Sequence, residues 1–550
     1  MKKFFTLLAL AAASLSAMAT DYTDQLVVTV DGKQMSAAQA TINVDANSNG
    51  TYKLTLKNFI MGAMMIGTIE IDDVPAVSNG QTTLLKVAKD IKIKNGDKIG
   101  LWIGPILGNV PVNMIGELRG DKFYTNIVIT MKVDNKMQDI NVGFGEGHYQ
   151  LPNAGFETFH TATLTQPADP DDPDAELAQV TSDEPDNWHS FMSASCPEGM
   201  EALVWLAGFN PVTFKSSDVR PGSTGKQSVM LKSVDMMGPG FIANGTITTG
   251  RMNTGSMMAA DTNSNYAWSD LTTTDKDAHG DPFYSVIYSR PDAMKVWVKY
   301  TQETPNADYP YATATALLND GTRFQEPAPS ETVYTNVVGE ARNPQIADTK
   351  GEWKELTIPF AYDDFKANGA IAKSVLVTFS TNAAPGQGSH SGDPTNPTSD
   401  ILYVDDMSFV YNAGLAAVSF TAADGEVYLL DGVNADTKEY SATLPFDVTA
   451  DNFKAMSDGQ GAYVSTTIAD GVATIEITSN DLLTTNTYKV NIAKGNAGGV
   501  TSGISGTVAD TNSAVTAIFT LDGKRVNAMA KGGLYIVKLA NGSVKKVMNK

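Results

Sequence analysis

The sequence predicts an all-β protein of several domains, and three observations support this. Short runs rich in Val, Ile, Thr and aromatic residues recur along almost the whole chain, separated by Gly, Asn and Asp turns. No capped helical pattern extends beyond about three turns. The 550 residues suit three or four domains of about 150 residues each, and a hydrophobic content of 42% is enough for several cores.

Residues 1–19 are predicted to be a secretory signal peptide. Lys2 and Lys3 form its positive end, residues 4–15 are apolar, and Ala17-Met18-Ala19 is a small-x-small cleavage site. We expect neither lipoprotein processing, because no cysteine follows the apolar stretch, nor a later transmembrane segment. The expected location is therefore periplasmic, cell-surface or extracellular.

Charge and cysteine content exclude several classes of function. The net charge is −21, and loss of Lys2 and Lys3 takes it to −23. Nucleic acid is not an expected partner, since binding phosphates requires a basic surface. Cys196 is the single cysteine, which excludes an intramolecular disulfide and a Cys-ligated metal cluster.

Residues 20–148 are predicted to form a closed antiparallel barrel. Strand-like runs and Asp-Gly or Asn-Gly turns alternate regularly there, and closure removes exposed sheet edges. Through "YTDQLVVTVDGK" and "TYKLTLKNFI" the segment resembles the calycin-like, lipocalin-related domain of exported Bacteroidota proteins. A barrel of this size either holds a small ligand or is filled by its own side chains.

Residues 150–412 are predicted to form a two-sheet jelly roll, interrupted by an acidic, Pro-rich loop at 160–187. The segment opens with "LPNAGFETF" and closes with "ILYVDDMSFVY". These motifs resemble the carbohydrate-metabolism domain of Bacteroidota, which is similar to galactose-binding-like jelly-roll carbohydrate-binding modules. The resemblance implies a β-sandwich that binds a polysaccharide or oligosaccharide.

The same resemblance implies a structural calcium ion, held by Glu157 of the opening motif and Asp405 of the closing strand, with Asp406 as the other candidate. Calcium takes six to eight oxygen ligands, and the first and last strands of a jelly roll meet. Strand alternation would place Asp405 on one face with Met407 and turn Asp406 to the other, which favours Asp405. The alternative is that these carboxylates face water without an ion.

Glycan binding would use aromatic faces, on which the apolar C–H surfaces of sugars stack. Four aromatic residues among polar loop residues are the platform candidates: Trp268, Tyr266, Tyr309 and Tyr311. Arg290 and Asp292 could bind sugar hydroxyls or form a surface ion pair. We expect Trp297 and Trp353, which lie in strand-like runs, in the core.

The sequence contains no recognisable catalytic signature. The nucleophile-elbow, zinc-helix and phosphate-loop motifs are all absent, and no two histidines have metal-binding spacing. His279 is expected to be a solvated loop residue. We therefore predict no catalytic residue and a non-catalytic glycan-binding protein of the cell envelope. Two alternatives stay open: a glycoside hydrolase or esterase that uses a carboxylate pair in the jelly roll, and a structural or adhesion protein of the surface.

Three further segments complete the chain. Residues 413–495 predict a small immunoglobulin- or cadherin-like spacer sandwich, and residues 496–506 a Gly-rich linker. Residues 507–550 predict a small β domain, whose last 29 residues, from Asp522, carry a net charge of +6. Through "LDGK", "KGGLYIV" and "KKV" the tail resembles the C-terminal sorting domain of type IX secretion, which implies the secretion machinery as a partner.

Overall fold

The computed structural model describes the following residues: 19–133, 136–167, 174, 176–236, 242–330, 332–362, 364–389, 398–434, 436–502, 506–507, 515–526, 529–530, 533–540 and 543–549. The predicted signal peptide lies outside them, except for its last residue. Strands account for 54% of the structure and helix for 2%, which confirms the all-β prediction. Among the described helices, none has the length and apolarity needed to cross a membrane. The chain divides into two compact units, Met1–Gly147 and His148–Lys550.

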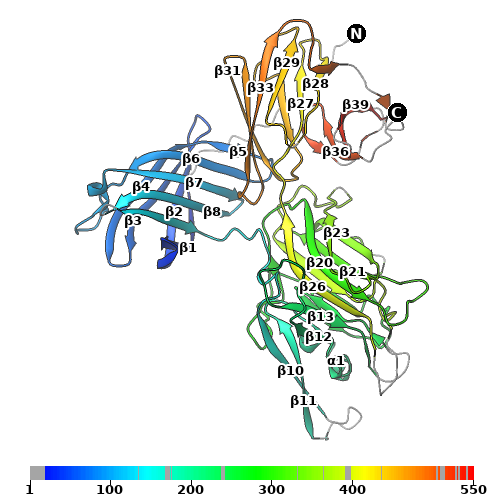
Figure 1. The fold of residues 1–550 in the computed structure, drawn as a ribbon. Coiled ribbons are helices and arrows are strands. Elements are labelled where there is room, and N and C mark those ends of the chain that lie inside the picture. Colours follow the sequence, from blue (N-terminus) through cyan, green and yellow to red (C-terminus); the bar gives the residue numbers. More distant parts are fainter. Residues whose placement is uncertain are drawn as a thin grey trace, which may run out of the picture. The chain divides into compact units, whose positions relative to one another are not determined.

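The first unit is a barrel-like sheet of antiparallel neighbours in the order β4-β3-β2-β1-β9-β8-β7-β6-β5 (Figure 1). Its elements are β1 (Thr20–Val30), β2 (Lys33–Ala46), β3 (Tyr52–Met61), β4 (Met64–Val74), β5 (Ala76–Ser78), β6 (Thr83–Lys92), the 3-10 turn η1 (Gly104–Leu107), β7 (Asn109–Arg119), β8 (Lys122–Val133) and β9 (Lys136–Phe144).

Two backbone hydrogen bonds nearly close this barrel. The N–H groups of Thr68 and Lys94 each donate to the carbonyl of the other, both over 2.9 Å. Gly67 allows this approach, because a Cβ on it would lie 2.1 Å from the Lys94 carbonyl oxygen. Apolar side chains from the strands fill the interior and leave a cavity of about 40 Å³, room for a few water molecules at most. Of the two expectations for the interior, the structure shows the filled one.

The first segment of the second unit is a jelly roll. One main sheet has the order β12-β13-β26-β20-β24, and the other has β16-β25-β21-β23 with β19 paired to β25. The elements are β10 (Phe159–Pro167), β11 (Leu177–Pro185), η2 (Phe191–Ser193), α1 (Glu201–Phe209), β12 (Thr213–Ser216), β13 (Ser228–Lys232), β14 (Val234–Asp235), β15 (Ile242–Ala243), β16 (Thr246–Thr248), β17 (Arg251–Thr254), β18 (Asn265–Ser269), β19 (Ser285–Val286), β20 (Ala293–Thr301), β21 (Ala312–Asn319), β22 (Phe324–Glu326), β23 (Val337–Ile346), β24 (Lys354–Pro359), β25 (Ser374–Ser380) and β26 (Ile401–Val410).

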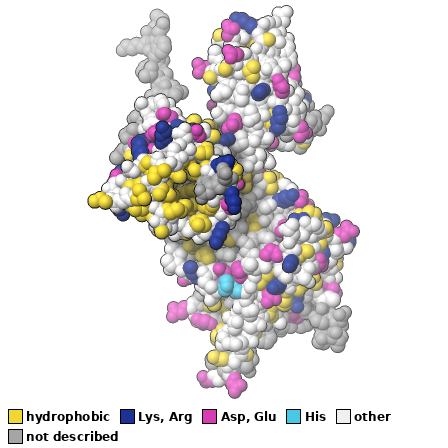
Figure 2. All heavy atoms as spheres, turned by 60° about the vertical axis from the view of Figure 1, so that its left-hand side comes forward, with side chains coloured by type: hydrophobic (Ala, Val, Ile, Leu, Met, Phe, Trp, Pro, Cys, Tyr) yellow, Lys and Arg dark blue, Asp and Glu magenta, His cyan; other side chains and the backbone are white. Residues whose placement is uncertain are grey.

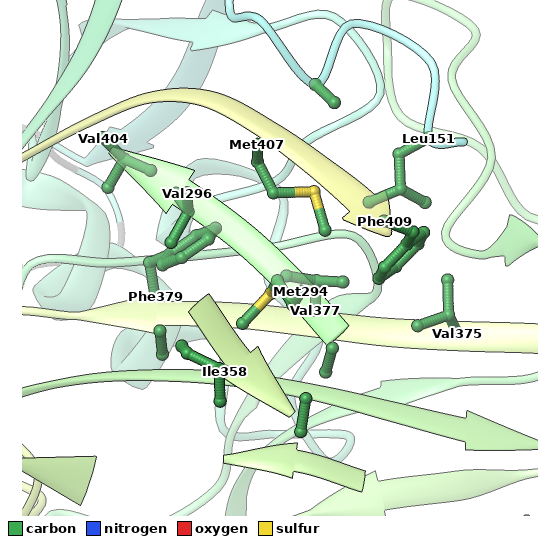
Figure 3. Packing of buried hydrophobic residues seen from close by; sticks show 14 of the residues in the cluster. Leu151, Met294, Val296, Ile358, Val375, Val377, Phe379, Val404, Met407 and Phe409 are labelled. Atoms are coloured by element: carbon green, nitrogen blue, oxygen red, sulfur yellow. The ribbon is translucent and has the colours of Figure 1, made fainter. Parts of the chain in front are cut away.

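The core of the jelly roll lies between these two sheets. Met294 and Val296 of β20 pack with Val404 of β26 against Val377 and Phe379 of β25 (Figure 3). Side chains alternate along a strand, so the residues between these core positions point out of the sandwich. This alternation decides which aromatic residues reach the surface of the sheet.

The expected loop at 160–187 is in part a hairpin. Strands β10 and β11 pair in antiparallel register from Phe159 opposite Pro185 to Pro167 opposite Leu177. Alternating threonines favour extended backbone there. Much of the acidic, Pro-rich composition that suggested a loop lies between the strands, although Asp183, Glu184 and Pro185 belong to β11. Most of that turn lies outside the described residues.

The remaining strands form a two-sheet spacer and a C-terminal sheet. The spacer sheets are β30-β27-β28-β34 and β29-β33-β32-β31, and the tail sheet is β35-β39-β38-β36-β37. Their bounds are β27 (Leu415–Thr421), β28 (Val427–Leu430), β29 (Glu439–Leu444), β30 (Phe453–Ser457), β31 (Tyr463–Ala469), β32 (Val472–Thr478), β33 (Thr485–Lys494), β34 (Val500–Ser502), β35 (Gly506–Thr507), β36 (Val515–Thr520), β37 (Arg525–Val526), β38 (Leu534–Leu539) and β39 (Val544–Met548).

The structure corrects the expected linker at 496–506. Its residues Val500–Ser502 form β34, which pairs with β28 as an edge strand of the spacer. The tail is not an isolated domain either, because Phe519 and Ile536 share a buried cluster with Val427 and Leu429 of the spacer. The Lys546 ammonium, although almost buried, donates to the Val427 carbonyl over 3.0 Å.

A half-buried carboxylate joins the jelly roll to the spacer. The two oxygens of Asp292 accept hydrogen bonds from the backbone N–H groups of Asn412 (2.7 Å) and Gln460 (2.8 Å). Burial raises the pKa of Asp292 to about 7, although these two donors act to lower it. The native state therefore holds a proton that the unfolded chain would release at a lower pH.

This proton predicts how the stability of the junction depends on pH. Between about pH 4 and pH 7 the native state binds more protons than the unfolded state, so the free energy of unfolding should fall as the pH rises through this window. Unfolding of Asp292→Asn, followed by denaturant titration, should have a flatter pH profile. Asp436→Asn, at an exposed site of the spacer, should keep the original slope; equal slopes for Asp292→Asn and the unmodified chain would contradict the assignment.

Candidate functional site

The outward face of the sheet β12-β13-β26-β20-β24 carries an aromatic patch. Because Val296 and Val298 point into the core, Trp297 and Lys299 between and after them point outward. Lys299 pairs directly with Tyr403 of β26, and Trp353 lies just before β24. We call Trp297, Trp353 and Tyr403 the aromatic face.

Charged groups hold these rings in place. The Lys299 Nζ lies 4.1 Å from the ring centroid of Tyr403 and 5.5 Å from that of Trp353. The Trp353 indole donates to Asp218 Oδ1 over 3.0 Å, and the other oxygen of Asp218 pairs with Lys299. The Arg220 guanidinium lies 5.5 Å from the Trp297 ring. Apolar rings beside fixed donors and acceptors are the combination that recognises a sugar ring and its hydroxyls.

The sequence-based placement of these tryptophans was wrong. Neither Trp297 nor Trp353 belongs to the core cluster, and both are half-buried. The signal was present in the sequence, since Lys295 and Lys299 flank Trp297 at two residues on either side. In a strand these three side chains share one face.

The four predicted platform residues lie in two separate places. Tyr266 and Trp268 are on β18, where Trp268 is buried and the Arg323 guanidinium lies 4.3 Å from its ring centroid. Tyr309 and Tyr311 precede β21, and Tyr309 is exposed. Tyr309 therefore presents an accessible ring, whereas Trp268 does not.

The two predicted hydroxyl-binding residues lie at the junction with the spacer. The Arg290 guanidinium is 4.0 Å from the Tyr362 ring centroid and donates to the Asn368 carbonyl, and its backbone N–H donates to Asn480. Both oxygens of Asp292 accept the hydrogen bonds described above. These contacts give Arg290 and Asp292 a role inside the protein, and we do not include them in the candidate site.

The predicted calcium ligands approach one another beside the aromatic face. The opening turn meets the last strand, because the Met407 N–H donates to the Ala154 carbonyl over 2.9 Å. A Cβ on Gly155 would lie 3.4 Å from Asp406 Oδ1 and 3.9 Å from Glu157 Cγ, so these two side chains flank Gly155. The opening turn therefore brings the Glu157 carboxylate close to the Asp406 carboxylate of β26.

A bulge in β26 changes the alternation expected for Asp405 and Asp406. Trp297 pairs with Asp405 and Lys295 with Ser408, so two residues of β26 lie opposite Val296 alone. Asp405 therefore shares the outward side with Trp297, whereas Met407 returns to the core. Asp406 sits in the bulge with a φ of 43°.

Protein groups already contact all three carboxylates. The backbone N–H of Lys226 donates to Glu157 over 2.9 Å, that of Arg220 donates to Asp405 Oδ2 over 2.8 Å, and the Arg220 side chain pairs with Asp406 at 2.5 Å. Burial raises the pKa of Asp405 to about 6, and its Oδ1 has no hydrogen-bond partner among the described residues. The described His, Asp and Glu groups whose ligand atoms converge within 4.8 Å of one another lie elsewhere.

The barrel unit carries an exposed apolar end. Figure 2 shows hydrophobic side chains gathered around a hollow of this unit. The exposed large apolar residues beside the β1–β2 and β3–β4 turns, near the start of β9 and between β6 and β7 are Met35, Ile60, Met64, Ile99, Leu101, Ile106, Leu107 and Met137. A surface pocket of about 840 Å³ lies over β2 and β3. The alternative of an adhesion protein would use such a surface.

Comparisons with known proteins bear on the barrel. The family model of the calycin-like beta-barrel domain matches residues 18–146, and no curated protein matches the chain. Two solved structures align: a "putative glycoside hydrolase" from Bacteroides thetaiotaomicron (12% identity, 70% of this chain, 84% of that chain, TM-score 0.26) and the ZmpB catalytic domain with two CBM51 domains from Clostridium perfringens (10%, 97%, 44%, TM-score 0.14). Neither alignment bears on function at these TM-scores. The nearly closed sheet of residues 18–146 thus fits the calycin-like beta-barrel domain that this segment matches.

Proposed function

We propose that the protein binds carbohydrate without catalysis, through the aromatic face of its jelly roll. The observation that carries the proposal is the outward arrangement of Trp297, Trp353 and Tyr403 beside Asp218, Lys299 and Arg220. Sugar rings stack on such rings, and the charged groups can bind their hydroxyls.

A hydrolase at this face is the less favoured function. Glycoside hydrolysis needs one carboxylic acid free to donate a proton and a second carboxylate that acts as base or nucleophile. Here Asp218 pairs with Lys299, and Asp406 pairs with Arg220. Carboxylates engaged in ion pairs suit binding better than proton transfer.

Binding to a glycan array tests the proposal. The full chain, with calcium present, should bind a specific oligosaccharide, and Trp353→Ala or Trp297→Ala should weaken binding about tenfold, the loss of one stacked ring. Tyr309→Ala, which removes an exposed ring outside the face, should bind normally. A blank array would contradict carbohydrate binding, and loss of binding in Tyr309→Ala alone would contradict the assigned face.

We also propose a structural calcium ion bound by Glu157 and Asp405, with Asp406 as the other candidate. The support is the approach of the opening turn to the last strand and the unpartnered Asp405 Oδ1. An ion would supply the partner that this buried oxygen lacks.

Thermal unfolding tests the calcium ion. Removal of calcium with EGTA should lower the Tm of the jelly roll, and Ca²⁺ but not Zn²⁺ should restore it. Asp405→Asn should abolish this response, and Asp424→Asn, at an exposed site of the spacer, should retain it. An unchanged Tm after chelation would count against the ion.

Export is proposed as well, with residues 1–19 as the signal peptide and 507–550 as the sorting tail. The tail contributes β35 to β39 and contacts the spacer, which is compatible with a terminal sorting module. A chain that lacks 507–550 should accumulate in a different compartment from the full chain on cell fractionation. An unchanged distribution would mean that the tail serves only to cover the spacer.

A further inference from the structure

A cluster of histidine and carboxylate side chains lies where the β10–β11 hairpin meets the 270–283 loop. His160 of β10 pairs in register with Glu184 of β11. The His160 Nε2 lies 3.7 Å from Glu184 Oε2 and 3.6 Å from Asp277 Oδ2. The Nδ1 of His189 lies 3.5 Å from the same Asp277 oxygen. The ligand atoms of His160, Glu184 and Asp277 therefore converge, all within 4.8 Å of one another, and His189 adjoins them through Asp277.

Three atoms of this cluster are buried and lack hydrogen-bond partners. Glu184 Oε2, Asp277 Oδ2 and His189 Nδ1 have none among the described residues. Their side chains are 1%, 4% and 0% exposed. Leaving such groups unpaired costs about 1–3 kcal/mol each, and more when they are charged. Separations of 3.5–3.7 Å exceed hydrogen-bond length but are those of neighbouring ligands around one ion.

The opposite atom of each ligand is held by a hydrogen bond. His160 Nδ1 lies 3.1 Å from Asp186 Oδ1, and His189 Nε2 lies 3.1 Å from the Pro282 carbonyl. A carbonyl only accepts, so Nε2–H of His189 donates and Nδ1 keeps its lone pair. This second contact of each ring is typical of metal-binding histidines.

In each of the two carboxylates, likewise, one oxygen accepts hydrogen bonds from the protein and the other faces the cluster. Glu184 Oε1 accepts from the N–H and the hydroxyl of Ser190. Asp277 Oδ1 accepts from the N–H groups of Gly280 and Asp281, both over 2.8 Å. In His160, Glu184 and Asp277 one polar atom is fixed by the protein and the other faces the shared region, and His189 Nδ1 faces Asp277.

No permanent cation compensates the cluster. Within the described parts of the chain, no Lys or Arg forms an ion pair with Glu184, Asp186, Asp277 or Asp281. The nearby Arg251 pairs with Asp275 and lies against the Phe283 ring. Burying several negatively charged carboxylates together costs free energy unless a cation lies among them.

We propose that His160, Glu184 and Asp277, whose ligand atoms all lie within 4.8 Å of one another, bind one divalent transition-metal ion of the zinc class, as a structural site. The edge of a tetrahedron is about 1.6 times its centre-to-corner distance, so the separations of His160 from Glu184 and from Asp277 fit an ion about 2.2 Å from its ligands, close to zinc distances. An imidazole ligand disfavours calcium and magnesium, which prefer oxygen. The ion would fasten the hairpin to the 270–283 loop.

His279 covers the outer side of the cluster. His279, expected to be a solvated loop residue, stacks on His160 with a centroid separation of 4.3 Å and an interplanar angle of 2°. Its Nδ1 contacts Asp281, which also accepts from the Asn187 N–H over 2.8 Å. The ligands lie 117 positions apart in the chain, so no local spacing reveals them.

The alternative occupant of the region is a proton on His160. Burial lowers the pKa of this ring, but Glu184, Asp186 and Asp277 outweigh burial and raise it to about 9. A charged His160 would offset part of the negative charge.

Metal content and metal-dependent stability test the site on the full chain. Protein purified without chelator should contain one equivalent of zinc by elemental mass spectrometry. After chelation and dialysis, added Zn²⁺ should bind at one equivalent and raise the Tm, and Co²⁺ should give the visible absorption of a tetrahedral site. Asp277→Asn should lose these responses, and Ser190→Ala should weaken Zn²⁺ binding about 10–100-fold.

Asp275→Asn provides the matched control, since it removes the same charge from the same loop two residues away. It should bind Zn²⁺ like the unmodified chain. Absence of Zn²⁺ and Co²⁺ binding by the unmodified chain would overturn the proposal, whatever the variants do, and would leave protonated His160 as the occupant. Equal loss of binding in Asp275→Asn and Asp277→Asn would overturn the assigned ligands.

Discussion

Burial of one face of the sheet β12-β13-β26-β20-β24 against the opposite sheet is the constraint on which the jelly roll depends. Met294, Val296 and Val298 must point inward to build the core. Strand alternation then turns Trp297 and Lys299 outward, whatever their own preference. The candidate binding face is therefore a direct consequence of the packing that holds the domain together.

The fold class and the N-terminal barrel could be predicted from the sequence, because both rest on repeated local patterns. Features that depend on a single local irregularity could not. The bulge at Asp406 and Met407 reverses the alternation within β26, and no turn or glycine signal in "ILYVDDMSFVY" marks it. The β10–β11 hairpin was not predicted for a similar reason. The acidic, Pro-rich composition between its strands indicated a loop, although the threonines of the strands favour extended backbone.

The aromatic face and the histidine cluster differ in how much of each could be predicted from the sequence alone. The Lys-x-Trp-x-Lys pattern around Trp297 indicates that this side chain points outward. A tryptophan within a strand, however, favours the prediction of a core residue. Trp353 reaches the same face from another part of the chain, so only the sheet order brings the two together. The histidine cluster depends wholly on tertiary structure, because His160, His189 and Asp277 belong to a hairpin, an irregular segment and a distant loop.

A crystal structure of the full chain with an oligosaccharide selected on the array tests the central claim most directly. We expect a sugar ring stacked on Trp297 or Trp353, with its hydroxyls within hydrogen-bond distance of Asp218, Lys299 or Arg220. A sugar bound at Tyr309 and Tyr311, or at the barrel, with the aromatic face left to solvent, would contradict it.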